Sequence, residues 1–240
     1  MKTGSEETGE TLRQQDIRHD EELRQFAYTV THDLREPLRM IGSYSQLLSR
    51  RYIDRLDSEG REFLDFINNG VQRMDSMLRD LLAYSHHSQA LDHPLSSVSA
   101  EAALEGVLLA LEKQIRETGA QITHDPLPEV MFDFNELTQV FRQLLSNSLK
   151  FHGAAAPQIH VSAESTDETV TFSVRDNGIG IDPRYHDQIF GLFKRLHRDE
   201  YPGTGMGLAI ARRIVTLRGG RIWLESEAGS GAIFHFTIPN

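Results

Sequence analysis

The sequence lacks cysteine and lacks any long apolar run. Its 240 residues contain no Cys, so neither disulfide bonds nor thiolate metal sites can form. No hydrophobic stretch approaches the roughly 20 residues that a membrane-spanning helix needs, and the N-terminus has no apolar signal-peptide core. We therefore expect a soluble, cytoplasmic protein without a membrane span.

Positive charge is also scarce. Lys and Arg number 25 against 35 Asp and Glu, which gives a formal net charge of −10. A nucleic-acid-binding surface needs clustered basic residues, so no nucleic-acid partner is expected. The composition, 39% hydrophobic and 25% charged, is that of an ordinary globular protein. A phosphate ligand would have to be held by local geometry and a metal ion.

The first third of the chain has helical periodicity. Residues 1–10 are polar and are expected to be disordered or frayed, and a long helix is predicted from about 12 to 52. Its apolar residues recur at spacings of three, four or seven. They are Leu23, Phe26, Val30, Leu34, Ile41 and Leu48. After a turn near 54–60, a second helix to about Ser85 has its own apolar face. That face consists of Phe63, Ile67, Val71, Met74, Leu78 and Leu81.

Two such helices predict an antiparallel hairpin over residues 11–90. A one-sided apolar seam on each helix favours a homodimer that forms a four-helix bundle. A monomeric hairpin docked on a second domain is the alternative. The segment 86–94 is interpreted as a linker, and its adjacent histidines do not share a helix face, so no metal site is assigned there.

Helices and strands alternate beyond the linker and predict an α/β domain over residues 95–240 with a mixed, mostly antiparallel sheet. Helices are expected at about 99–118, 134–151 and 204–217. Strands are expected at about 120–124, 158–164, 169–176, 221–225 and 232–238. Asp133 is a suitable N-cap for the second of these helices.

Two glycine-containing motifs follow predicted elements of this domain. Asp176 ends a strand and precedes Gly178 and Gly180; alternate glycines let the backbone approach a ligand, and the carboxylate can accept a hydrogen bond from an adenine amino group. By itself this pattern is also a common turn. The second motif contains Gly203, Thr204, Gly205 and Gly207. It precedes a helix, so its N–H groups and the positive end of the helix dipole would face a phosphate. Neither the dinucleotide fingerprint nor the P-loop pattern fits.

Asn147 and Lys150 lie three residues apart on one predicted helix face. An amide oxygen is a suitable hard ligand for Mg²⁺, and a lysine can meet phosphates as a point charge. Such residues are singly most often solvated surface groups. Their position upstream of both glycine motifs favours a shared nucleotide site.

A further candidate is His32, in the segment T-H-D-L-R-E-P-L. Neutral imidazole is a competent nucleophile near pH 7. Asp33 can take the proton from the opposite ring nitrogen or hold the tautomer that exposes the attacking one. Pro37 lacks a backbone N–H and is expected to kink the helix.

Taken in order, these motifs resemble the catalytic core of sensor histidine kinases, most like those linked to phytochrome or PAS domains. The second domain is similar to the Bergerat ATP-binding fold of gyrase, Hsp90 and MutL. The resemblance implies that His32 accepts a phosphoryl group, that Asp176 reads adenine and that Asn147 coordinates Mg²⁺. It also implies a phenylalanine motif over 190–193 and an ATP lid over 194–203, in which Arg195 approaches the terminal phosphate.

The implied reaction is autophosphorylation of His32 from ATP and Mg²⁺, followed by transfer to an Asp of a response-regulator receiver domain. Residues 12–30 would form an input coil whose upstream sensor domain is absent from this chain. Two positions depart from the family pattern. Gln143 replaces the usual Asn, and Glu36 stands where kinases with phosphatase activity commonly have Thr or Asn, which makes that activity doubtful.

Two other functions stay open at this point. One is a pseudokinase kept as a scaffold, which would bind nucleotide without forming phosphohistidine. The other is an ATPase of the gyrase and Hsp90 class, which would release phosphate and needs no histidine hairpin. Whether transfer occurs within one chain or across a dimer depends on the turn near 54–60.

Overall fold

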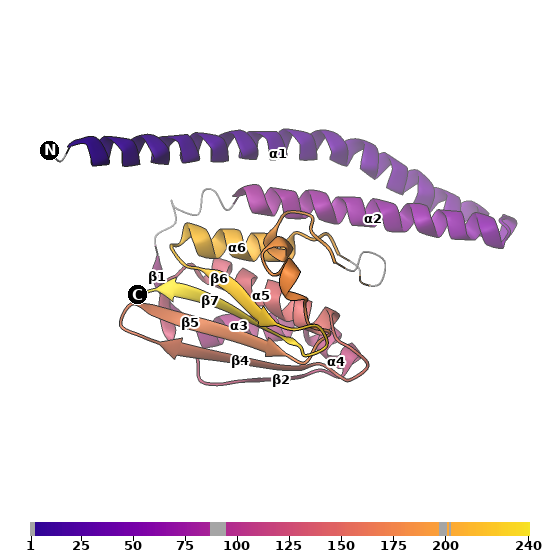
Figure 1. Cartoon of the computed structure of the whole chain (residues 1–240). Helices are drawn as coiled ribbons and strands as arrows, with labels where there is room; N and C mark the ends of the chain where they lie inside the picture. Colours follow the sequence, from indigo (N-terminus) through magenta and orange to yellow (C-terminus); the bar gives the residue numbers. More distant parts are fainter. Residues whose placement is uncertain (1–2, 87–94, 197–200, 202) are drawn as a thin grey trace. The chain divides into compact units, whose positions relative to one another are not determined.

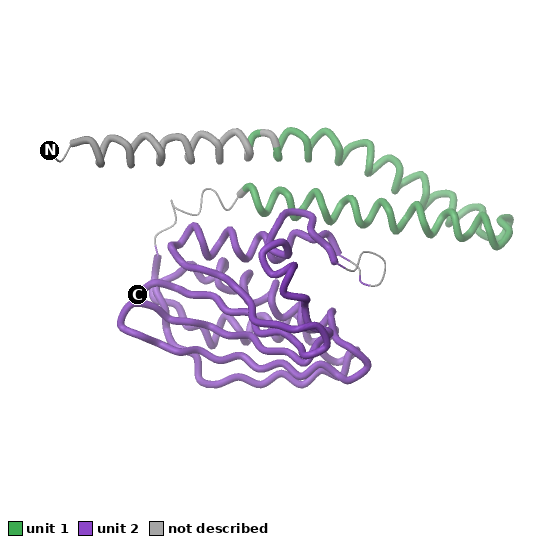
Figure 2. Tube along the Cα trace, in the orientation of Figure 1, with its two compact units in different colours: residues 1–88 green, residues 89–240 purple. Residues whose placement is uncertain are grey.

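The computed structural model describes residues 3–86, 95–196, 201 and 203–240, with side chains at residue 25 and from residue 27 onward within those ranges. The chain divides into two compact units, Met1–Ser88 and Gln89–Asn240 (Figure 2). The predicted linker lies, after His86, outside the described residues. Within the described part, no helix is long and apolar enough to cross a membrane.

The first unit is the predicted helical hairpin (Figure 1). It contains α1 (Thr3–Tyr52), the short helix η1 (Ile53–Arg55) and α2 (Ser58–His86). Asp57 begins α2, because its Oδ1 accepts a hydrogen bond from the Gly60 N–H at 2.8 Å, as N-cap residues do.

The start of α1 differs from the expectation. The helix begins at Thr3 instead of near residue 12, so residues 3–10, expected to be disordered or frayed, have helical backbone. Once a helix has nucleated, each added residue gains one hydrogen bond.

Mostly small side chains mediate the contact between α1 and α2. Its buried members are Ala27, Thr31, Leu38, Gly42 and Ser45 of α1, with Leu64, Leu78 and Ser85 of α2. A Cβ built on Gly42 would lie 3.0 Å from a Val71 methyl carbon, and Ser45 Oγ donates to Asn68 Oδ1 at 2.8 Å. The two helices therefore approach closely where their residues are small.

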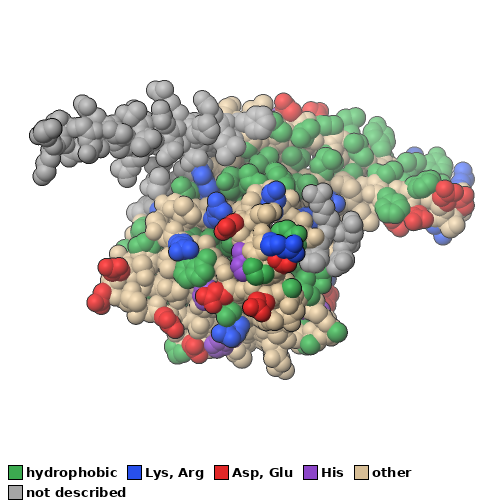
Figure 3. Space-filling view, in the orientation of Figure 1, with side chains coloured by type: hydrophobic (Ala, Val, Ile, Leu, Met, Phe, Trp, Pro, Cys, Tyr) green, Lys and Arg blue, Asp and Glu red, His purple; other side chains and the backbone are tan. Residues whose placement is uncertain are grey.

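The predicted apolar stripes largely stay on the surface of the single chain. Leu34, Ile41 and Leu48, spaced by seven, are 44–52% exposed. On α2, Phe63, Ile67 and Met74 are exposed as well. Figure 3 shows hydrophobic side chains gathered along the hairpin. The side chains of Leu23 and Phe26 lie outside the described residues.

The second unit is the predicted α/β domain with a mixed sheet. Its helices are α3 (Ala100–Ala110), α4 (Glu112–Thr118), α5 (Phe134–Lys150) and α6 (Gly207–Leu217), with the short helices η3 (Pro183–Tyr185) and η4 (Gln188–Phe190). Its strands are β1 (Ser96–Ser99), β2 (Gln121–His124), β3 (Glu129–Phe132), β4 (Gln158–Ser165), β5 (Thr169–Asp176), β6 (Ile222–Ser226) and β7 (Ala232–Pro239). The main sheet has the order β2-β4-β5-β7-β6, and of its pairs only β2 with β4 is parallel.

One local prediction was wrong in this unit, and one pair of strands was not foreseen. The helix expected over 99–118 is divided at Leu111 into α3 and α4. The strands β1 and β3, which pair antiparallel in a separate two-stranded sheet, were not foreseen. Each has four residues, too few for an alternating pattern to be distinctive. The N-cap prediction is confirmed, since Asp133 Oδ1 accepts from the Glu136 N–H at 3.0 Å.

An aromatic cluster joins α5 to the middle of the sheet. Phe141 of α5 meets Phe172 of β5 and Phe236 of β7 edge-on, each at 5.6 Å between ring centroids. The latter two rings stack at 4.9 Å, and all three are fully buried. Burial of such rings dominates core energetics, so this cluster fixes α5, which carries the candidate site residues, against the middle of β5 and β7.

A buried ion pair joins α5 to the end of α6. Arg218 Nε donates to Glu136 Oε2 at 2.8 Å, and both side chains are less than 10% exposed. Removing one partner of a buried pair leaves an uncompensated charge and typically costs about 3–5 kcal/mol.

We predict that Glu136→Ala lowers the free energy of unfolding of the second unit by about 3–5 kcal/mol. Trp223 is the sole tryptophan and lies in β6, so its fluorescence during urea titration reports this unit. The control is Glu112→Ala, which breaks the exposed pair with Arg116 and should cost under about 1 kcal/mol. Equal shifts of the two midpoints would contradict a structural role for the buried pair.

Candidate functional site

Three protein groups hold the carboxylate of Asp176 at the end of β5. Its Oδ1 accepts hydrogen bonds from the backbone N–H of Gly178 at 2.9 Å and of Ala232 at 3.1 Å. Its Oδ2 accepts from Ser148 Oγ at 2.8 Å. A carboxylate has about four acceptor sites, so this group keeps capacity for a further donor while its orientation is fixed.

Ser148 was not identified from the sequence. It follows Asn147 on α5, is 3% exposed and donates its hydroxyl proton to Asp176. A lone Ser inside a helix has no distinctive spacing, so only the fold places it beside the strand end.

At Gly178 and Gly180, backbone atoms of neighbouring segments occupy the space that a side chain would need. A Cβ at Gly178 would lie 2.5 Å from the Phe151 carbonyl oxygen, which also accepts from the Ile179 N–H at 3.0 Å. Gly180 has a φ of +67°, and a Cβ there would lie 1.9 Å from the Glu227 carbonyl oxygen. The glycines therefore let this loop pack against the end of α5 and the turn before β7.

The second glycine motif approaches α5 in a similar way. A Cβ at Gly203, whose φ is +145°, would lie 2.7 Å from Lys150 Nζ. One at Gly207 would lie 2.5 Å from Gln143 Oε1. Gly205 has a φ of +78°, which favours glycine. Gly203 and Gly207 therefore let this loop lie directly on side chains of α5, whereas Gly205 lies against the backbone of Phe193 and Lys194.

The N-terminus of α6 follows this loop directly. The helix begins at Gly207, and no side chain caps it. Met206, which precedes it, is fully buried, and the Met206 N–H donates to Thr204 Oγ1 at 3.3 Å. An uncapped helix N-terminus presents N–H groups and partial positive charge, which suits an anion.

Two cations lie beside this helix start. Lys150 Nζ is 4.2 Å from the centroid of the Phe151 ring. Burial, together with the positive charge of Arg195, lowers the pKa of Lys150 to about 8. Arg195 Nη2 donates to the Tyr201 carbonyl oxygen at 2.6 Å. The predicted lid, 194–203, is described only at 194–196, 201 and 203.

Asn147 supplies the amide of the site. It lies one turn before Lys150 on α5 and is half-buried. Among the described residues, no group of three or more His, Cys, Asp or Glu can hold a metal ion. A single amide oxygen fits Mg²⁺ in particular, because that ion keeps several waters and takes its other ligands from phosphates.

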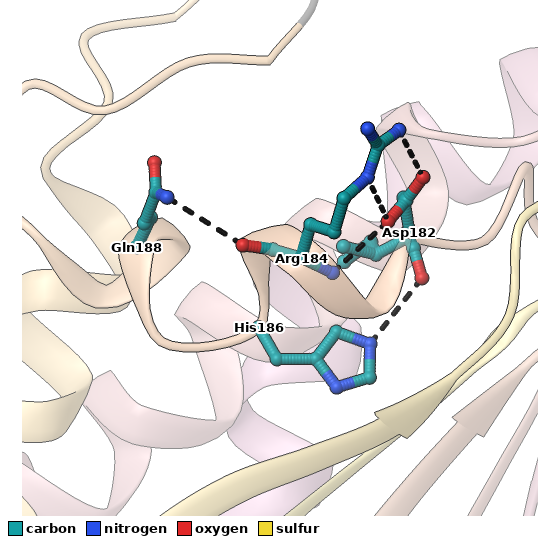
Figure 4. Close-up of polar contacts among 5 residues, drawn as sticks. Asp182, Arg184, His186 and Gln188 are labelled. Carbon is teal, nitrogen blue, oxygen red and sulfur yellow. Dashed lines mark hydrogen bonds and ion pairs between the residues drawn. The ribbon is translucent and has the colours of Figure 1, made fainter.

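Polar contacts within the loop that follows Gly180 join Asp182, Arg184, His186 and Gln188 (Figure 4). Asp182 forms a two-point ion pair with Arg184 at 2.7 and 3.0 Å. Hydrogen bonding to Arg184 lowers the pKa of Asp182 to about 2. His186 Nε2 donates to the Ile181 carbonyl at 3.3 Å. These groups shape the loop and are not assigned to a ligand.

His32 and Asp33 lie in the other unit, on α1. His32 Nδ1 is 3.1 Å from Asp33 Oδ1, and the two side chains are 72% and 70% exposed. Since a carboxylate only accepts hydrogen bonds, Nδ1–H is the donor in this contact. In the neutral tautomer that makes it, the lone pair is on Nε2. Pro37 lies inside the same helix, which bends along its second half (Figure 1).

The structure thus brings most predicted residues of the second unit together. The loop from Asp176 to Gly180 contacts the C-terminal end of α5 at Ser148 and Phe151. The loop from Gly203 to Gly207, which leads into α6, contacts the same helix at Gln143 and Lys150. Arg195 joins them through its effect on Lys150. Two residues that contact this site, Ser148 and Tyr201, were not identified from the sequence.

Two family models match the chain. The model of the His Kinase A (phospho-acceptor) domain matches residues 22–90, and that of the histidine kinase-, DNA gyrase B-, and HSP90-like ATPase matches residues 132–240. Cyanobacterial phytochrome A of Nostoc sp. is 51% identical over 224 residues, which are 92% of this chain and 29% of that protein. Phytochrome-like protein Cph1 of Synechocystis sp. is 41% identical over 92% of this chain and 30% of its own length.

The chain therefore spans less than a third of the length of these two relatives. Among solved structures, full-length ShkA in complex with AMPPNP is similar, with a TM-score of 0.69 and 28% identity. The match covers 90% of this chain and 45% of that one.

We predict that Gly180→Ala destabilises the second unit more than Gly229→Ala. Both positions have positive φ, which costs a non-glycine residue about 1–2 kcal/mol. A Cβ at Gly229 meets nothing within 4 Å, whereas one at Gly180 collides with the Glu227 carbonyl. Thermal unfolding followed by Trp223 fluorescence measures the difference. Identical unfolding temperatures for the two variants would show that the loop is not packed as described.

Proposed function

Because this chain belongs to the histidine kinases, we propose that it transfers the γ-phosphoryl group of ATP to His32 and then to an Asp of a receiver domain. The chain is a sensor histidine kinase core with a phospho-acceptor domain and an ATPase-like domain. One observation carries the proposed reaction. An oriented acceptor, Asp176, lies in the same unit as an uncapped helix start flanked by Lys150 and Arg195.

The nucleotide binds to the second unit with its base toward Asp176. The carboxylate accepts a hydrogen bond from the adenine amino group, and Gly178 and Gly180 keep the neighbouring backbone in place. The phosphates lie at the backbone N–H groups of the Gly203–Gly207 loop, next to Lys150 and Arg195. The AMPPNP complex of ShkA, which contains a nucleoside triphosphate analogue, supports this assignment.

Asn147 is proposed to hold Mg²⁺ through its amide oxygen. The bound ion would neutralise negative charge on the phosphate oxygens. Gln143, in place of the usual Asn, has its Oε1 against Gly207. The longer amide therefore fills the space beside the helix start and keeps the second glycine loop at a fixed distance from α5.

His32 is the acceptor, and Asp33 controls its ring. The Nδ1–H donates to Asp33, so the lone pair of Nε2 attacks the γ-phosphorus while the bond to the leaving ADP oxygen breaks. Asp33 accepts the Nδ1 proton as the ring gains positive charge. Phosphoryl transfer needs mainly positioning and charge neutralisation, which is what the groups of the two units supply.

The chain is proposed to consist of two functional domains. Residues 11–90 form the dimerisation and phosphotransfer domain, with residues 12–30 as its input coil, and residues 95–240 form the ATP-binding domain. The exposed stripes of the hairpin support a homodimer, because Leu34, Ile41 and Leu48 on α1 and Phe63, Ile67 and Met74 on α2 would otherwise face water. Four helices can bury such stripes.

We predict that γ-labelled ATP labels the wild-type protein and that His32→Gln abolishes the label with nearly unchanged nucleotide affinity. The label should be lost in acid and survive base, as a phosphoramidate does. His124→Gln, which changes a histidine of β2, is the control and should label normally.

The same assay separates the alternative functions. Labelling that persists in His32→Gln would move the acceptor elsewhere. Nucleotide binding without label would favour a scaffold. Release of phosphate without label would favour an ATPase of the gyrase and Hsp90 class.

We predict that ATP affinity falls as pH rises above about 8. The free protein has Lys150 with a pKa of about 8, and bound phosphates favour its charged form and raise that pKa. Below pH 8 the charge is already present, so affinity is flat; above pH 8 binding requires proton uptake and weakens by up to about tenfold per pH unit.

Phosphate groups are fully ionised in this range, because their second pKa is about 6. Calorimetry between about pH 7.5 and 9.5 measures the profile. Lys150→Gln should bind more weakly and with a flat profile, and Lys113→Gln, an exposed lysine paired with Glu117, should behave as the wild type. A wild-type affinity that is constant across this range would refute the role of Lys150.

A further inference from the structure

Three contacts of Tyr201 within the second unit are described below, and neither the motifs nor the family resemblance assigned this residue a role. Its ring lies 5.0 Å from the Phe151 ring at an angle of 56°. Its hydroxyl donates to the His152 carbonyl at 3.3 Å. Its own carbonyl accepts from Arg195 Nη2 at 2.6 Å. The side chain therefore fastens one backbone carbonyl to the end of α5.

These contacts connect the two cations of the proposed phosphate site. Phe151, on which the Tyr201 ring packs, also lies under Lys150 Nζ at 4.2 Å. Arg195 is held by the Tyr201 backbone, and its charge reaches Lys150. One residue thus contacts Arg195 directly and Lys150 through an aromatic ring.

The hydrogen bond between Arg195 and the Tyr201 carbonyl affects how the site binds a phosphate. An arginine side chain has many rotamers, and ordering it on binding reduces affinity. A short hydrogen bond to a charged donor is stronger than a neutral one, so the Tyr201 carbonyl orders the guanidinium before a ligand arrives. The carbonyl can do this only if its own backbone is fixed, and the ring of Tyr201 against Phe151 fixes it.

We propose that Tyr201 is a positioning residue that makes the site selective for a nucleoside triphosphate over a diphosphate. It does so by presenting Arg195 to the terminal phosphate. The inference rests on the proposed ATP site and on the role of Arg195 there. Selectivity follows because ADP lacks the phosphate that Arg195 approaches, whereas the base and the inner phosphates are held by other groups.

The ring and the hydroxyl make separable contributions. The hydroxyl bond at 3.3 Å is long for an O–H donor, so Tyr201→Phe should keep the packing and most of the selectivity. Tyr201→Ala removes the packing, and Tyr201→Leu keeps apolar volume without an aromatic face. Tyr185→Ala is the matched control, since Tyr185 lies in η3 with its ring near Arg184 and away from the proposed phosphate contacts.

The experiment is calorimetry of the full chain with AMPPNP and with ADP, each in the presence of Mg²⁺. We expect Tyr201→Ala to weaken AMPPNP about tenfold and ADP less than about threefold, with Tyr201→Phe and Tyr185→Ala close to the wild type. In combination with Arg195→Gln, Tyr201→Ala should add little further loss for AMPPNP. Such non-additivity is what residues in one network give, and a purely structural role would not produce it.

The outcomes separate the inference from its premise. Equal weakening of both nucleotides by Tyr201→Ala and Tyr201→Leu, or fully additive loss with Arg195→Gln, overturns the role of Tyr201 and leaves the ATP site standing. A wild-type protein that binds neither nucleotide overturns the ATP site and this inference together. The unfolding transition of Trp223 shows whether each variant is folded, and Tyr201→Leu stands in for Tyr201→Ala if the latter is not.

Discussion

The carboxylate of Asp176 is the interaction on which the arrangement of the second unit depends. It accepts hydrogen bonds from α5 through Ser148, from its own loop through Gly178 and from the start of β7 through Ala232. Three segments far apart in the sequence therefore meet on two oxygen atoms. An apolar side chain would leave these donors unpaired, at about 1–3 kcal/mol for each buried group. The carboxylate that we propose binds adenine thus also helps to position α5 and β7.

A chain with a net charge of −10 can hold a polyphosphate only through local concentration of positive charge. The second unit provides it with an uncapped helix start, Lys150 and Arg195. Lys150 is partly desolvated against Phe151, which lowers its pKa and makes its charge costly until a phosphate arrives. Burial has two opposite effects on the Lys150 ammonium. It destabilises the charged form in the free site, and it strengthens the Coulomb attraction between that charge and a bound phosphate.

The sequence predicts those features that depend on local pattern. The alternation in β4, β5 and β7 and the Asp133 cap are local, and both are present. The pairing of β1 with β3 and the hydrogen bond from Ser148 to Asp176 join residues about 30 positions apart, so no local pattern encodes them. In the hairpin, periodicity identified apolar stripes, yet the helices meet through Ala27, Gly42 and Ser45, because backbone approach is limited by side-chain size. Tyr201 was not identified because the contact with Arg195 is made by its carbonyl, which every residue has.

The candidate residues of the first unit differ from those of the second unit in their exposure to solvent. His32 and Asp33 are largely exposed, so their arrangement owes little to burial and depends on one hydrogen bond between neighbouring residues. That bond fixes which ring nitrogen carries the proton and leaves Nε2 open on the helix surface. The proposed acceptor role requires His32 to meet first a nucleotide and later a receiver domain, so this residue has to remain accessible to both. Exposure is then a requirement of the proposed two-step transfer. The groups proposed to neutralise phosphate charge, Lys150 and Arg195, belong to the other unit, where both are partly buried.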